Sequence, residues 1–164
     1  MRSGSVALLL VSSIASAQVA RIEAIDIVDY GIYESEVARR IDDSSSASGG
    51  RAGVKSIKHK ERASTIQARV GLQFGFRFYV EGTPTGAEVR LRSITRFPPQ
   101  GMHNPNTQKT NHSDVYTIIA KIGSADFRGY AFDEDWEIVP GIWTFEFWEG
   151  DRKLVEQRFT VVQP

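Results

Sequence analysis

The sequence predicts an all-β protein, an antiparallel immunoglobulin-like β-sandwich of about seven strands. Apolar and polar residues alternate through several short segments, and this period of two is typical of strands with one buried face. Residues that favour turns, mainly glycine, proline and serine, separate these segments. No segment has the periodicity of a convincing helix, so strands do not alternate with helices as in parallel α/β folds. We expect strands near residues 22–33, 54–60, 72–81, 87–96, 114–122, 141–149 and 153–162.

The first 17 residues have the parts of a secretory signal peptide. Arg2 gives a positive start, residues 6–11 begin an apolar run that reaches Ile14, and residues 15–17 form a small-residue cleavage site. We therefore expect export, with Gln18 first after cleavage. The apolar run is too short to cross a bilayer, and no later segment approaches the roughly 20 apolar residues of a membrane helix.

The rest of the chain, residues 18–164, has a normal length for a single domain with a core of its own. The sequence has no cysteine, so no disulfide stabilises it, and nine Phe and three Trp are available for packing. The chain has 20 basic and 20 acidic residues. This balance gives no reason to expect nucleic acid as a partner.

The first predicted strand, residues 22–33, changes face in its middle. Ile25 and Ile27 share one side, whereas Val28 and Tyr30 share the other, which predicts a strand that shifts between two sheets through a local irregularity. Residues 34–43 are charged and favour a turn of helix. After them, the serine-rich and glycine-rich stretch within residues 43–53 predicts a flexible exposed loop.

Residues 54–62 form a short, strongly basic strand in our interpretation. Lysines commonly protect the edge of a sheet from aggregation, and an anion-binding site is the alternative. The next strand, residues 72–81, alternates without a break. If it forms a hairpin with residues 87–96, then Arg77, Tyr79, Arg90 and Arg92 share an outer face. This basic and aromatic group is a candidate partner-binding patch, and a solvated outer face is the alternative.

The last two predicted strands form a hairpin, and its register follows from which residues, odd-numbered or even-numbered, share the buried face. If Trp143, Phe145 and Phe147 share a face with Val155 and Phe159, then Trp143 pairs with Phe159 and Phe147 pairs with Val155. This pairing favours a three-residue turn, residues 150–152, over a two-residue turn. In the same register Trp148 lies on the outer face. It is a candidate partner-binding residue, because large aromatic side chains are enriched in binding hot spots. The alternative is that Trp136 or residues 34–53 cover it.

Two groups of residues are candidates for a metal site. His103 and His112 lie in a long polar loop, residues 97–113, and Asp114 follows. Their spacing matches no compact ligand motif, so we predict polar loop residues and no metal. Three adjacent acids, Asp133, Glu134 and Asp135, do not easily all reach one calcium ion. We therefore expect a solvated acidic turn there.

Hydrolysis is the second chemistry. Asp133, Asp135 and Glu137 could supply a carboxylate pair, but glycosidase chemistry needs two groups that face each other across a cleft. The chain lacks a nucleophile elbow, a phosphate loop, a dinucleotide-binding fingerprint and a cysteine nucleophile. The sequence thus predicts no enzyme and no cofactor.

Several motifs with spaced aromatic and glycine residues resemble an uncharacterised bacterial family, domain of unknown function 3859. The resemblance extends over nearly all of the chain after the signal peptide. It implies a small exported protein of Gram-negative bacteria, hence the periplasm, and it brings no established catalytic or binding residues. The motifs are Asp29-Tyr-Gly-Ile-Tyr33, Ala68-Arg-Val-Gly71 with Phe74-Gly75, Arg96-Phe-Pro-Pro99, Trp136-Glu137 with Pro140-Gly141, Trp143 and Phe145, and Gly150 with Arg152-Lys-Leu154 and Phe159.

The function itself stays unknown at this level. We expect an exported, non-enzymatic binding or interaction module of the cell envelope, with an envelope protein or a glycan as partner. One alternative is a metal-dependent or carboxylate hydrolase that uses residues 103–135. Another is a purely structural envelope protein.

Overall fold

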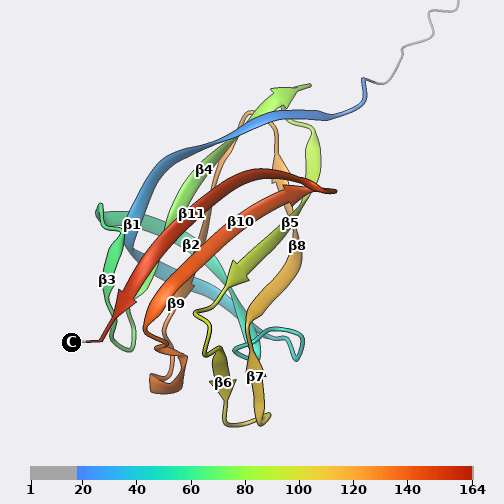
Figure 1. Cartoon of the computed structure of the whole chain (residues 1–164). Helices are drawn as coiled ribbons and strands as arrows, with labels where there is room; N and C mark the ends of the chain where they lie inside the picture. Colours follow the sequence, from blue (N-terminus) through green and yellow to red (C-terminus); the bar gives the residue numbers. More distant parts are fainter. Residues whose placement is uncertain (1–17, 164) are drawn as a thin grey trace, which may run out of the picture.

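The computed structural model describes residues 18–163, except the side chains of residues 37, 38 and 40, and its two main sheets form a sandwich (Figure 1). The four-stranded sheet has the order β2-β1-β4-β9, with bounds β1 Arg21–Asp42, β2 Gly50–Glu61, β4 Gln73–Thr83 and β9 Ala125–Ala131. The five-stranded sheet has the order β3-β11-β10-β5-β8, with bounds β3 Thr65–Gln67, β5 Glu88–Arg96, β8 Ser113–Lys121, β10 Gly141–Glu149 and β11 Arg152–Val162.

A small ribbon and one 3₁₀ turn complete the described elements. Strands β6, Met102–Asn104, and β7, Lys109–Asn111, form the ribbon, and η1 spans Asp135–Glu137. The predicted all-β sandwich is therefore confirmed. The expected count of about seven strands is wrong, since the described residues contain eleven. The additional strands are short or, like β9, lack strict alternation of apolar residues.

The core lies between the inward faces of β4 and β10. Phe74 and Phe78 of β4 are fully buried, as are Trp143 and Phe147 of β10. The ring centroids of Phe78 and Phe147 are 4.6 Å apart, and those of Phe74 and Trp143 are 5.7 Å apart in an edge-to-face arrangement. Such aromatic pairs stabilise beyond the area that they bury, so these alternating residues both specify the strands and join the two sheets.

The β10–β11 hairpin has the predicted register but a different turn. Trp143 pairs with Phe159 and Phe147 pairs with Val155, as parity requires. A register shift after Phe147 then pairs Trp148 with Lys153 and leaves a two-residue turn, residues 150–151. The predicted three-residue turn is therefore wrong. A β-bulge at the register shift places one extra residue on β11, so the core pairs keep the predicted register although the turn has only two residues.

Strand β1 is longer than predicted and stays in one sheet. A register shift between Ile27 and Asp29 marks the predicted change of face. The segments before and after this shift nevertheless belong to the same four-stranded sheet. Residues 34–42 are not helical. They pair with β2 as an antiparallel arm, and an ion pair of 3.0 Å joins Glu34 to Lys60 across its strands. We call residues 34–61 the arm.

The tip of the arm is a packed turn, whereas the sequence predicted a flexible exposed loop near residues 43–53. Strand β2 begins at Gly50, and Ser46 and Ala47 in the tip are buried. The backbone amide of Ser46 donates to the carbonyl of Asp43, and Asn104 Nδ2 donates to the carbonyl of Ala47 at 3.2 Å. The serine-rich composition therefore forms a packed turn. As predicted, the basic strand β2 lies at the edge of its sheet.

Strands β4 and β5 do not form the hairpin on which the predicted basic patch depended. They lie in different sheets, because the connection after Thr83 carries the chain across the sandwich. Phe76 and Leu91 both point into the core from opposite sides. Since each strand turns its apolar residues inward, the outward residues of β4 and β5 lie on opposite faces of the molecule.

Candidate functional site

Trp148 lies on the outer face of the five-stranded sheet. The neighbouring inward positions on β10 carry Phe145 and Phe147, so alternation turns Trp148 outward. It pairs with Arg92 on β5 and Lys153 on β11. The Arg92 guanidinium carbon is 5.5 Å and the Lys153 ammonium 5.3 Å from the Trp148 ring centroid. These are cation–π distances, so two cations flank a partly exposed indole.

Glu146 holds this cluster in place. Its carboxylate is buried and accepts a 2.7 Å hydrogen bond from Trp148 Nε1 and a 2.8 Å hydrogen bond from Arg96 Nε. Lys153 Nζ lies 3.6 Å from the same carboxylate. Burial alone would raise the pKa of Glu146, but the hydrogen bonds from Arg96 and Trp148 outweigh it and lower the pKa. Glu146 thus fixes the orientation of the indole.

Ile119 and Thr117 of β8 lie on this same outer face, on the far side of β5 from Trp148. Ile119 on β8 is 57% exposed and pairs with Arg90, and Thr117 pairs with Arg92. A shallow hollow of about 250 Å³ lies among Arg90, Arg92, Thr117 and Trp148. We call Arg90, Arg92, Thr117, Ile119, Trp148 and Lys153 the outer-face patch. It combines an aromatic residue, exposed apolar area and the positive charges of Arg90 and Arg92, whereas Lys153 forms an ion pair of 2.5 Å with Glu156.

Arg77 and Tyr79 do not join this patch. They lie on β4 in the other sheet, and Arg77 forms a bidentate ion pair with Asp29 of the neighbouring strand. The Tyr33 hydroxyl also donates to the Asp29 carboxylate. The hydrogen bonds from Arg77 are the main cause that lowers the pKa of Asp29. Arg77 therefore ties β4 to β1, and the predicted four-residue patch is not assembled.

The candidate metal residues His103 and Asp114 do not converge, and the hydrolase candidates Asp133, Asp135 and Glu137 lie in and beside the single turn η1. His103 points outward on β6, where its Nδ1 is 3.1 Å from Thr110 Oγ1, whereas Asp114 is buried on β8. Within residues 18–163 no three His, Cys, Asp or Glu side chains are placed to hold a metal ion. The three acids 133–135 are exposed, and the buried Glu137 accepts from the backbone amide of Asp133 at 2.6 Å.

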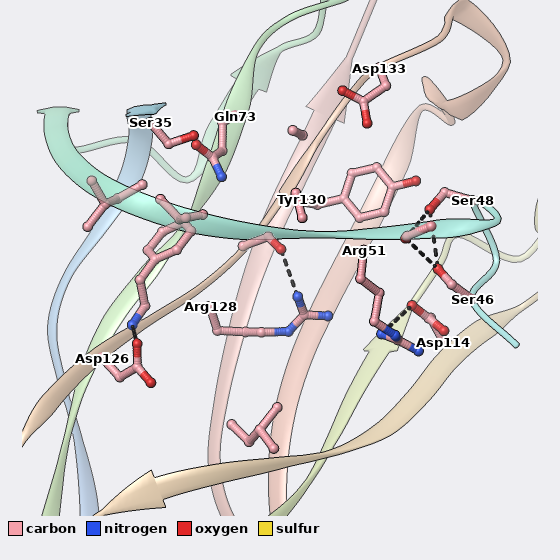
Figure 2. A pocket seen from close by; sticks show the side chains of 18 of the residues that line it. Ser35, Ser46, Ser48, Arg51, Gln73, Asp114, Asp126, Arg128, Tyr130 and Asp133 are labelled. Atoms are coloured by element: carbon pink, nitrogen blue, oxygen red, sulfur yellow. Dashed lines mark hydrogen bonds and ion pairs between the residues drawn. The ribbon is translucent and has the colours of Figure 1, made fainter. Parts of the chain in front are cut away.

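A cavity of about 380 Å³ was not foreseen from the sequence. It lies between the arm, strand β9 and the inward face of β8, and we call it the arm cavity (Figure 2). No sequence pattern indicates it, because the composition of residues 34–53 predicts helix and loop and not a strand pair that covers the sandwich. Both Asp114 and Asp133, from the region considered for a hydrolase, line it.

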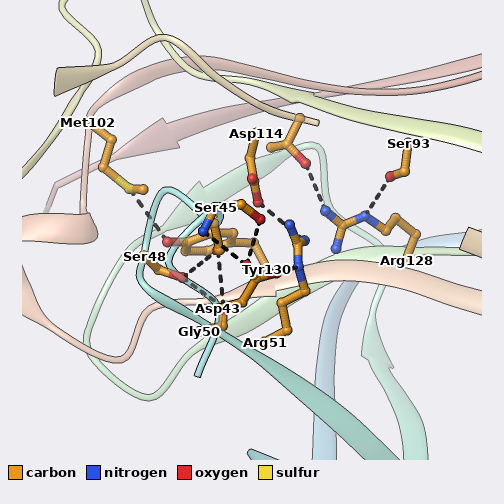
Figure 3. A network of polar contacts seen from close by, with 12 residues as sticks. Asp43, Ser45, Ser48, Gly50, Arg51, Ser93, Met102, Asp114, Arg128 and Tyr130 are labelled. Carbon is orange, nitrogen blue, oxygen red and sulfur yellow. Dashed lines mark hydrogen bonds and ion pairs between the residues drawn. The ribbon is translucent and has the colours of Figure 1, made fainter. Parts of the chain in front are cut away.

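A polar network crosses the wall of the arm cavity (Figure 3). Arg51 Nε donates to Asp43 Oδ2 at 2.6 Å, and Arg51 Nη1 lies 3.6 Å from Asp114 Oδ2. Arg128 donates to the Ser93 and Thr95 hydroxyls at 3.1 and 3.0 Å. Burial raises the pKa of Asp114, and the nearby Arg51 and Arg128 act in the opposite direction. This network links the arm to both sheets.

Comparisons with known proteins agree with the fold. The chain is similar to the crystal structure of an immunoglobulin-like protein from Pseudomonas aeruginosa, with 25% sequence identity and a TM-score of 0.57. The similarity covers 90% of this chain and 99% of that chain. No functionally curated protein matches the sequence. Among residues 18–163, no helix is long and apolar enough to cross a membrane.

The family suggested by the sequence motifs is also found by a family model. That model, described as "Domain of unknown function (DUF3859)", matches residues 21–161. The match includes both main sheets, the arm and the β10–β11 hairpin. The chain therefore belongs to the DUF3859 family.

Proposed function

We propose that this protein is a non-enzymatic binding module of the bacterial cell envelope, exported to the periplasm, and that it contacts a protein partner through the outer-face patch. The observation that carries this proposal is the partly exposed Trp148 between Arg92 and Lys153. Tryptophan and arginine dominate binding energy at protein interfaces, where they fill desolvated centres surrounded by weaker contacts.

The chemistry of the patch indicates the kind of partner. Arg90 and Arg92 give positive charge, and Ile119 adds exposed apolar area. A partner surface that combines acidic and apolar side chains complements this patch. Glu146 pre-orients the indole before binding, which reduces the entropy that ordering of a contact residue would cost.

Co-purification of envelope proteins with tagged variants tests this proposal. The variants are Trp148→Ala and, as a matched control on the opposite face, Tyr79→Ala. Proteins that copurify with the wild type are quantified by mass spectrometry after periplasmic extraction. We expect at least one acidic envelope protein to be lost about tenfold or more with Trp148→Ala and retained with Tyr79→Ala. Equal recovery with both variants would contradict a role for the patch.

The non-enzymatic part of the proposal has its own test. Disaccharides such as maltose and chitobiose are incubated with the purified protein and followed by chromatography, because Asp114 and Asp133 line one cavity and glycosidases use two carboxylates. We expect the disaccharides to be recovered intact. Hydrolysis that Asp114→Asn abolishes would instead support the carboxylate hydrolase.

A further inference from the structure

We infer that the arm cavity is a second binding site, and that its ligand is a small neutral saccharide or polyol. The three buried side-chain polar atoms that lack a hydrogen-bond partner among the described residues are Arg51 Nη2, Gln73 Oε1 and Asp114 Oδ1. All three residues line the arm cavity. Buried polar atoms are nearly always hydrogen-bonded, so three orphans around one cavity indicate a site for a polar ligand.

Asp114 supplies a buried polar group that faces this cavity. Its side chain lies on the inward face of β8, and the residue is only 7% exposed. The distance of 3.6 Å between Asp114 Oδ2 and Arg51 Nη1 is longer than a hydrogen bond, and Asp114 Oδ1 has no hydrogen-bond partner among the described residues. A buried carboxylate with an open acceptor atom is costly unless a donor reaches it. A ligand hydroxyl in the cavity would supply that donor.

The charges around the cavity favour a neutral ligand. Its lining contains three basic residues, Arg51, Lys55 and Arg128, and three acidic residues, Asp114, Asp126 and Asp133. The formal charges cancel, so neither an anion nor a cation gains from the cavity as a whole. This separates the arm cavity from phosphate and carboxylate sites, in which cationic groups are in excess.

The hydrogen-bonding groups favour hydroxyls. The orphan atoms are one donor, on Arg51, and two acceptors, on Gln73 and Asp114. A ligand must therefore both accept and donate within a small space. Each hydroxyl does both and rotates to suit its partner, whereas an amide presents fixed donors and acceptors. Tyr130 adds aromatic area to the cavity wall, against which the apolar face of a sugar ring can pack (Figure 2). Phe127 also lines the cavity, whereas the Arg51 guanidinium lies 3.6 Å from the Tyr116 ring centroid and covers that ring.

The size and place of the cavity agree with this ligand. About 380 Å³ is near the lower end of ligand-binding pockets, which suits one or two sugar rings. Asp114 and Tyr116 face the cavity, whereas Thr117 and Ile119 on the same strand β8 belong to the outer-face patch. The two sites thus lie on opposite faces of β8, and either proposal can fail without the other.

Calorimetric titration of the purified protein tests the inference. The neutral probes are glucose, maltose and N-acetylglucosamine, and the other probes are glucose-6-phosphate, glucosamine and a neutral dipeptide amide. Saturable binding of at least one neutral saccharide, about tenfold or more tighter than the other probes, is the expected result. Asp114→Asn replaces the charged acceptor by a neutral amide, and the loss of the charge from that hydrogen bond should weaken binding about tenfold or more.

A second pair of variants keeps the test independent of folding. Gln73→Leu removes an orphan acceptor in the cavity, and Gln67→Leu makes the same change at an exposed position on β3. We expect only Gln73→Leu to weaken saccharide binding, with both variants folded by circular dichroism. If the orphan atoms are merely hydrated, no neutral saccharide binds. Any one of three results would overturn the inference. These are no binding of a neutral saccharide, preferential binding of a charged probe or the dipeptide amide, and unchanged binding in Gln73→Leu.

Discussion

At the scale of single residues, Glu146 is a buried charge that orients a partly exposed aromatic side chain, Trp148. It lies on the outer face of β10, yet it is only 3% exposed because Arg96, Trp148 and Lys153 cover it. The strand pattern predicted that Trp148 points outward. It did not predict this network, because the partners come from β5 and β11 and their approach depends on the sheet order.

Replacement of Glu146 by Gln should destabilise the fold by about 1–2 kcal/mol at pH 7, because it removes the charge that Arg96 and Lys153 face. The folded-state pKa of Glu146 is lowered. Its contribution is therefore fully present above the unfolded-state pKa of about 4.3 and is lost as the pH falls through the lower folded-state pKa. Urea unfolding at pH 7 and at pH 3 measures both effects.

The matched control for Glu146 is Glu88→Gln, at an exposed position of β5. The difference between wild type and Glu146→Gln should shrink toward pH 3, whereas Glu88→Gln should stay close to wild type at both pH values. A difference for Glu146→Gln that does not change with pH would show that its charge is not what stabilises the fold.

At the scale of elements, three glycines pair across the four-stranded sheet. Gly31 on β1 pairs with Gly75 on β4, and Gly75 pairs with Gly129 on β9. A side chain at Gly75 would place its Cβ 2.3 Å from the carbonyl oxygen of Arg128. The strands thus approach more closely here than any residue with a Cβ allows.

Gly75→Ala should therefore cost about 1–3 kcal/mol, the usual cost of overpacking a dense region. Gly53→Ala on β2 is the control, because its Cβ would meet only the Arg39 carbonyl oxygen at an ordinary 3.7 Å. Urea midpoints of the two variants measure the difference. Equal midpoints would mean that the glycine row does not require close packing.

Strands with strict alternation were predictable from the sequence, and those that depend on distant partners were not. The register of Trp143 and Phe147 followed from parity alone, although the bulge near Trp148 did not. The hairpin proposed for Arg77 and Arg90 failed because alternation says which side of a strand is buried and not which sheet the strand joins. The arm was missed because residues 34–53 carry too few apolar residues to signal strands.

At the scale of the whole molecule, the sandwich separates the two candidate binding sites. The outer-face patch lies on one side of β8, and the arm cavity with Asp114 lies on the other side. The family and the all-β class could be recognised from the sequence. The arm cavity could not, since it forms only when residues 34–61 fold across β8 and β9.

Export is the prediction that concerns the whole chain, and the signal-peptide residues on which it rests lie outside the described residues. In a Gram-negative host, we expect protein from the periplasmic fraction to begin at Gln18, because signal peptidase cleaves after small residues such as Ala17. Intact mass spectrometry of that fraction measures this. A full-length chain confined to the cytoplasm would contradict it.

Direct contact at position 148 is the most immediate test of the outer-face patch. A photo-crosslinking phenylalanine analogue replaces Trp148 in one variant and Tyr79, on the opposite face, in another. After irradiation of living cells, we expect position 148 to give a discrete adduct with an envelope protein, lost when Arg92→Glu reverses the neighbouring charge, and position 79 to give none. Adducts at both positions alike, or none at position 148, would contradict the proposal that this face binds a partner.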